Sequence, residues 1–183
     1  MGDLTGPLAR VEVNGEWRQL DGVPPDATLG QVLRDQLGQR DVKLPCAEGA
    51  CGACTVLLDG SAVPSCLVYV GRASGRRVTT VTGLADDPLG RAVIVALVEH
   101  GGLQCGYCSP GFVCAATAAL RGLAGRRAVD ARHVLADALA GHLCRCTGYR
   151  RILDAVVAVA TAEGLAGADT CEVAPASHSP SGD

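Results

Sequence analysis

Ten cysteines stand in this chain of 183 residues, and most of them are spaced as metal ligands are. The first group reads C-x4-C-x2-C with a fourth cysteine after eleven further residues, and comprises Cys46, Cys51, Cys54 and Cys66. The second group combines a C-x2-C with a later C-x-C, and comprises Cys105, Cys108, Cys144 and Cys146. Thiolates at such spacings bind zinc or iron–sulfur clusters. The chain is therefore expected to hold two metal centres.

The first group has the ligand spacing of a plant-type 2Fe–2S cluster, in which one loop supplies three thiolates. Small residues between these ligands let the loop wrap a cluster with its amide groups aimed at the sulfurs. They are Ala47, Gly49, Ala50, Gly52 and Ala53. A structural zinc site is the alternative, although zinc loops usually pair two short knuckles. The spacing favours a 2Fe–2S cluster, with Cys66 reaching back from the next strand.

The second group is less distinctive. A C-x2-C together with a C-x-C fits one zinc ion in a tetrahedron of thiolates as well as it fits an iron–sulfur cluster. The neighbouring first group favours a second cluster. Cys108 falls at the start of a predicted helix, where we expect the helix dipole to stabilise a thiolate.

Residues 8–82 are predicted to form a mixed α+β domain. Asn14-Gly15 is a type I′ hairpin signal between two alternating segments. Thr28 is positioned to cap a helix that ends near Gly38. Strands are expected at 8–13, 16–20 and 55–58, from 62 onward after a second turn, and at 77–81.

Beyond a predicted linker at 83–87, the pattern becomes helical and predicts a second domain over 88–163. Four helices joined by short loops indicate a compact bundle. Their expected ranges are 88–100, 109–123, 130–143 and 148–163. The small, polar residues 164–183 are expected to form an extended or disordered tail.

Composition excludes several functional classes. The net charge of −3 offers no basic stripe for nucleic acid. No apolar run is long enough to span a membrane, and no secretory signal is visible after Met1. Cysteines in a chain without a signal point to metal rather than disulfides, so we expect a cytoplasmic protein.

Three motifs together resemble the iron–sulfur small subunit of the xanthine oxidase (molybdenum hydroxylase) family. They are CAEGACGACTV at 46–56, QCGYCSPG at 104–111 and LCRCTGY at 143–149. The resemblance covers residues 8–163. It implies an N-terminal β-grasp plant-type ferredoxin domain and a C-terminal four-helix-bundle 2Fe–2S domain, an α+β protein with one cluster in each domain.

The resemblance also implies roles for individual residues. The first quartet would hold the cluster distal to molybdenum and the second quartet the proximal one. Gln104 and Cys146 would contact a molybdenum pterin, and an amide offers both donors and acceptors to a pterin edge. The alternative for Gln104 is a hydrogen bond from its loop to backbone. Cys114 is expected to be an inert buried thiol, Cys171 a free thiol in the tail, and His142 a loop or capping residue.

The family further implies that the chain is the electron-transfer subunit of a multi-subunit oxidoreductase and is not catalytic alone. A large subunit would carry the molybdenum pterin, expected as the molybdopterin cytosine dinucleotide, and oxidise an aldehyde or N-heterocycle. Electrons would then reach FAD in a medium subunit or an external acceptor, in a heterotrimer or a dimer of heterotrimers. A free-standing ferredoxin-like carrier and a zinc-stabilised interaction module are the alternatives.

Overall fold

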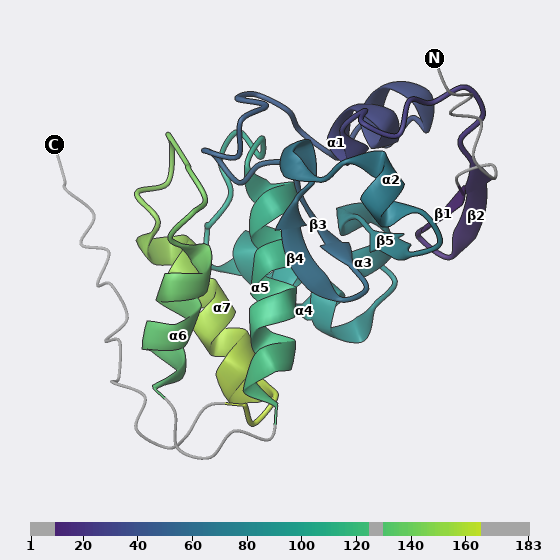
Figure 1. Cartoon of the computed structure of the whole chain (residues 1–183). Coiled ribbons are helices and arrows are strands. Elements are labelled where there is room, and N and C mark those ends of the chain that lie inside the picture. Colours follow the sequence, from purple (N-terminus) through teal and green to yellow (C-terminus); the bar gives the residue numbers. More distant parts are fainter. Residues whose placement is uncertain (1–9, 125–129, 166–183) are drawn as a thin grey trace, which may run out of the picture.

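The computed structural model describes residues 10–124 and 130–165 (Figure 1). The first two residues of the expected hairpin, nearly all of the expected tail and Cys171 lie outside these ranges. Within them, no helix is long and apolar enough to cross a membrane.

A five-stranded mixed sheet, ordered β2-β1-β5-β3-β4, forms the N-terminal part. Asn14 and Gly15 both have positive φ, 51° and 88°, as the predicted type I′ turn requires. The central strand β5 runs parallel to β1 and antiparallel to β3. The strands are β1 (Arg10–Val13), β2 (Glu16–Gln19), β3 (Thr55–Leu58), β4 (Ser61–Pro64) and β5 (Arg77–Thr79).

The helix predicted after Thr28 is present, but most of it is wider than an α-helix. The Thr28 hydroxyl accepts a hydrogen bond from the amide of Gln31 and so caps α1 (Leu29–Gln31). A π-helical turn (Val32–Gln36) follows directly. A second short helix, α2 (Val70–Ala73), was not predicted because four residues are too few to show a period.

The C-terminal part consists of four longer helices, as predicted. Two of them match the expected ranges within one residue, and the other two are shorter. They are α4 (Pro88–Glu99), α5 (Ser109–Leu123), α6 (Ala131–Leu139) and α7 (Arg150–Ala162). The start of α7 moves two residues inward because Gly148 and Tyr149 have φ of 65° and 68°, which a right-handed helix does not allow.

The segment expected as a linker is structured. The last predicted strand stops at Thr79 because the Thr80 amide donates to the Asn14 side chain, 2.9 Å away. Helix α3 (Val81–Leu84) begins at once, and Leu84 is buried in the helical core. Asp87 then caps α4. The range 83–87 therefore holds the end of α3, where Leu84 is buried, and a short turn into α4.

Helix α5 lies between the sheet and the other long helices, with β3 and β4 on one side and α6 and α7 on the other (Figure 1). Its buried residues are mostly small, including Ala115 and Ala116, so neighbouring elements approach closely. Leu57 of β3 belongs to the same hydrophobic core as the helices. Val56 and Leu58 of β3 belong to a separate core, which β1, β5 and the first helix share.

Replacing Asp87 with alanine should lower the free energy of unfolding by about 1–2 kcal/mol, because it removes an N-cap and an ion pair. The Asp87 carboxylate accepts from the Gly90 amide and from the Arg121 guanidinium, both at 2.7 Å. Denaturant unfolding of the iron-loaded chain measures the change.

The matched control is Asp86→Ala, since the Asp86 carboxylate is 92% exposed and lies 3.8 Å from Arg91. It should change stability by less than about 0.5 kcal/mol. Equal losses from both variants would contradict the capping role of Asp87.

Candidate iron–sulfur sites

The thiols of the first quartet gather in two pairs beside the sheet. The sulfurs of Cys46 and Cys51, on the loop before β3, are 3.2 Å apart. The buried thiol of Cys54 contacts that of Cys66. Cys66 lies in a 3₁₀ turn (Ser65–Leu67), so its expected place on a strand was wrong. The Ser65 amide and hydroxyl both donate to the Cys54 carbonyl, and this turns the chain out of β4.

The loop of the first quartet wraps around its own sulfurs. Ala47, Gly49 and Gly52 have φ of 57°, 80° and 70°, so successive amides turn inward. The amide of Glu48, helped by the Cys51 thiol, lowers the pKa of Cys46 to about 7. The deeper end of the site behaves differently, since burial raises the pKa of Cys66 to about 11. Metal binding at this site would therefore have to displace the proton of the Cys66 thiol.

The second quartet is built from two loops, one before α5 and one between α6 and α7. The sulfurs of Cys105 and Cys146 are 3.6 Å apart, and both residues are exposed. Cys108 and Cys144 form the inner pair, whose thiols also contact each other. The structure thus brings all eight predicted ligands together as two quartets, each divided into pairs.

The pKa values of the two inner thiols shift in opposite directions. Burial, followed by the neighbouring Cys144 thiol, raises the pKa of Cys108 to about 12, although Cys108 stands at the start of α5. Burial also opposes ionisation of Cys144, but the Thr147 hydroxyl and amide, 3.1 and 3.5 Å from its sulfur, lower the pKa overall. Thr147 was not singled out from the sequence, although it stands in the LCRCTGY motif.

The pairing of the thiols fits a group with two metal atoms. Each iron of a 2Fe–2S cluster takes two protein thiolates, whereas zinc needs ligands around one point. In the described ranges, no three histidine, cysteine or acidic side chains converge as ligands of a single ion. With amides aimed at the sulfurs, the donor sets suit 2Fe–2S clusters better than zinc.

Gln104 and Cys146 meet at the surface beside the second quartet. The Gln104 side-chain amide donates to the Cys146 carbonyl at 3.2 Å. This is the loop-to-backbone bond that we considered as the alternative role of Gln104. The same bond holds both residues on one exposed edge.

His142 lies in the loop after α6, as expected, and its amide donates to the Leu139 carbonyl at 3.0 Å. It is buried, 3.1 Å from the Thr55 hydroxyl of β3, and its ring packs on Phe112 at 5.2 Å. Burial lowers its pKa, so the imidazole is neutral at pH 7. Its role is to join the helical part to the sheet. Cys114 is a buried thiol whose pKa burial raises to about 12, as expected for an inert residue.

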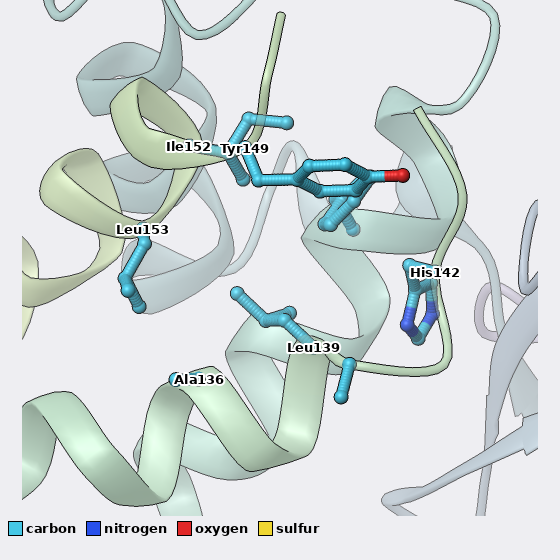
Figure 2. Close-up of a pocket in the computed structure, with 8 residues that line it drawn as sticks. Ala136, Leu139, His142, Tyr149, Ile152 and Leu153 are labelled. Carbon is cyan, nitrogen blue, oxygen red and sulfur yellow. The ribbon is translucent and has the colours of Figure 1, made fainter. Parts of the chain in front are cut away.

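An apolar cavity of about 280 Å³ lies between α6 and the start of α7, with Tyr149 above it and His142 at its right side in Figure 2. Its other lining residues are Phe112, Ala136, Leu139, Ala140, Ile152 and Leu153. The lining carries no thiol, carboxylate or amine. The chemistry that this part of the chain can support therefore lies in the cysteine loops and not in the cavity.

Two family models match the chain in succession. The 2Fe-2S iron-sulfur cluster binding domain matches residues 11–78, and the [2Fe-2S] binding domain matches residues 80–157. Their boundary falls between β5 and α3. The fold is thus a plant-type ferredoxin domain followed by a helical 2Fe–2S domain.

Similar proteins share nearly the whole described chain. The nicotine 6-hydroxylase small subunit of Paenarthrobacter nicotinovorans is 41% identical over 80% of this chain and 86% of its own length. The xanthine dehydrogenase iron-sulfur-binding subunit of Escherichia coli O157:H7 is 41% identical over 79% and 89%. The crystal structure of quinoline 2-oxidoreductase from Pseudomonas putida 86 superposes with a TM-score of 0.73 at 33% identity, covering 86% and 94%. This chain therefore belongs to the iron–sulfur small subunits of the xanthine oxidase (molybdenum hydroxylase) family.

Proposed function

We propose that this chain takes electrons from a molybdenum-pterin centre in a large partner subunit. It passes them to FAD in a medium subunit or to an external acceptor. An electron-transfer role follows from its two 2Fe–2S-binding domains and its family. The substrate class is an aldehyde or an aromatic N-heterocycle, supported by relatives named for nicotine, quinoline and aldehyde. Unpaired cysteines are usual in a reducing compartment, which supports a cytoplasmic location.

We assign the two clusters to the two quartets. The distal site comprises Cys46, Cys51, Cys54 and Cys66, and the proximal site comprises Cys105, Cys108, Cys144 and Cys146. When bound, a 2Fe–2S group accepts and releases one electron at a time. The chain itself orients the thiolates, aims amides at them and shields Cys54 and Cys66 from water.

The single observation that carries the proposal is that both quartets lie beside exposed apolar side chains. Tyr107, Leu143 and Tyr149 surround the second quartet and are 49%, 56% and 43% exposed. Leu67 and Tyr69 follow Cys66 and are 58% and 57% exposed. Exposed apolar side chains that gather around one site mark protein contacts, whereas scattered ones do not. Two such surfaces suit a subunit that binds one electron donor and one electron acceptor. A free-standing ferredoxin-like carrier would not need an apolar surface at either quartet.

Gln104 and Cys146 are proposed to contact the pterin of the large subunit. Both lie on the exposed edge of the second quartet, and the Gln104 amide uses one donor on the Cys146 carbonyl. An amide side chain has a second N–H and a carbonyl oxygen with which to bind a polar ring. The proposed large subunit would cover the exposed thiols of Cys105 and Cys146.

Replacing Cys105 with serine should remove one of the two 2Fe–2S EPR signals, halve the iron content and stop turnover in the assembled enzyme. The ferredoxin-domain signal should persist. EPR of the reduced protein and iron analysis measure both effects.

Cys114→Ala is the control, because that thiol is buried in α5 and belongs to neither quartet. Two signals in the Cys105 variant would show that the ligand assignment is wrong. Iron-free material containing zinc would favour the zinc-stabilised interaction module.

Replacing Thr147 with valine should make the potential of the second-quartet cluster more negative, because the hydroxyl hydrogen bond to the Cys144 sulfur favours the reduced, more negative state. The reduction potential should fall by tens of millivolts. A hydrogen bond contributes roughly 1 kcal/mol, and for one electron about 59 mV corresponds to a tenfold change in the equilibrium constant. EPR-monitored redox titration gives the value.

The control for this titration is Thr161→Val, whose hydroxyl donates to a carbonyl on α7. It should leave both potentials unchanged. Equal shifts in the two variants would rule out a specific effect of Thr147 on the cluster.

The tagged chain should co-purify with a large molybdenum-containing polypeptide, and Leu143→Glu should abolish this because it places a charge in the apolar contact. Size-exclusion chromatography with metal analysis measures the complex. Arg91→Glu on α4 is the control, because that side chain is polar and 66% exposed. A chain that carries both clusters and never associates with such a polypeptide would instead be a free-standing carrier.

A further inference from the structure

The loops that hold the two quartets touch through their backbones. The amide of Leu143 donates a hydrogen bond to the carbonyl of Cys51 at 2.9 Å. Cys51 belongs to the first quartet, and Leu143 directly precedes Cys144 of the second. A path thus leads from the Cys51 sulfur through its own carbonyl, across one hydrogen bond, and along the Leu143 backbone to the Cys144 sulfur.

Two glycines make this approach possible. A Cβ atom on Gly111, near the start of α5, would meet the Gly52 carbonyl and lie 3.1 Å from the Ala53 Cα. A Cβ atom on Gly52 would lie 2.6 Å from the His142 ring and 2.9 Å from the Gly141 carbonyl. Any side chain at either position would force the two loops apart.

His142 fixes the same contact from the other side. Its ring lies between Thr55 of β3 and Phe112 of α5, and the Thr55 hydroxyl donates to the Gly52 carbonyl at 2.7 Å. Because His142 is buried and directly precedes Leu143, its position determines where the Leu143 amide points.

We propose that the Cys51–Leu143 hydrogen bond is the electronic bridge between the two cluster sites, and that Gly52, Gly111 and His142 are positioning residues that keep it closed. The inference rests on the proposed function. One electron leaves the reduced group held by the second quartet and arrives on the oxidised group held by the first. No bond forms or breaks, and no proton moves.

The physical reason is that electronic coupling decays with distance and decays faster across a van der Waals gap than along bonded atoms. A hydrogen bond between the backbones of two ligand loops replaces such a gap. The packing of Gly52 against His142 and Gly141 brings the loops together without a hydrogen bond. The Lys43 ammonium lies 5.8 Å from the centre of the Tyr107 ring.

The direct test replaces Leu143 by its α-hydroxy acid analogue, which puts an ester oxygen where the amide N–H was and keeps the side chain. The same replacement at Leu165 is the control, since that amide donates at 2.8 Å to Ala160 at the end of α7. The iron-loaded full-length chain is reduced by one electron with a light flash. Freeze-quench EPR then follows redistribution between the clusters.

Transfer should slow by roughly tenfold to a hundredfold in the Leu143 ester, the order expected when positioned groups lose their alignment. Both EPR signals should remain, and the Leu165 ester should match the unmodified chain. Equal rates in the two esters would overturn the bridge. Absence of the two signals from the unmodified chain would instead overturn the proposed function.

Gly111→Ala tests the positioning residues without synthetic chemistry. Its control is Gly122→Ala on the same helix, where a Cβ would meet nothing within 4 Å. Hydrogen-exchange mass spectrometry should show lost protection around Leu143 in the Gly111 variant only, together with slower transfer. Lost protection with an unchanged rate would refute the role of the hydrogen bond.

Discussion

The Gly52 carbonyl lies against the Cα of Gly111, and much of the molecule is arranged around this contact. It brings the start of α5 onto the loop of the first quartet. Helix α5 then runs on between the sheet and the other long helices, so β3 and the helices share one hydrophobic core. A two-domain chain becomes one packed body in which neither cysteine loop can shift without disturbing the other.

The two quartets differ in what surrounds them. Cys54 and Cys66 are buried beside the sheet, whereas Cys105 and Cys146 are exposed. Backbone amides donate most of the hydrogen bonds to the first quartet. In the second quartet, the Thr147 hydroxyl also donates to the Cys144 sulfur. Since hydrogen bonding and solvent exposure both set the potential of an iron–sulfur cluster, the two sites are built to differ in potential. A difference of this kind gives electron flow a direction.

Several elements were predicted correctly from signals that are local in the sequence. Asn14-Gly15 gave the first hairpin its turn, and α5 has the predicted bounds because Pro110 fits its first turn. Other elements depended on distant partners. The helix predicted to reach Leu143 stops at Leu139 because the Leu143 amide donates to Cys51 instead of to its own helix. Likewise, β5 ends where the Asn14 side chain accepts a hydrogen bond from the Thr80 amide.

By itself, the sequence determined the two groups of four thiols, the division into a β-rich and a helical part, and the family. These depend on spacing and period, which are local properties of the chain. Only the tertiary structure decided that the thiols meet in pairs, that Thr147 donates to Cys144, that His142 joins the two parts, and that Cys51 and Leu143 share a hydrogen bond. Spacing along the chain specifies which atoms can bind a metal, whereas contacts between segments far apart in sequence depend on how the elements pack.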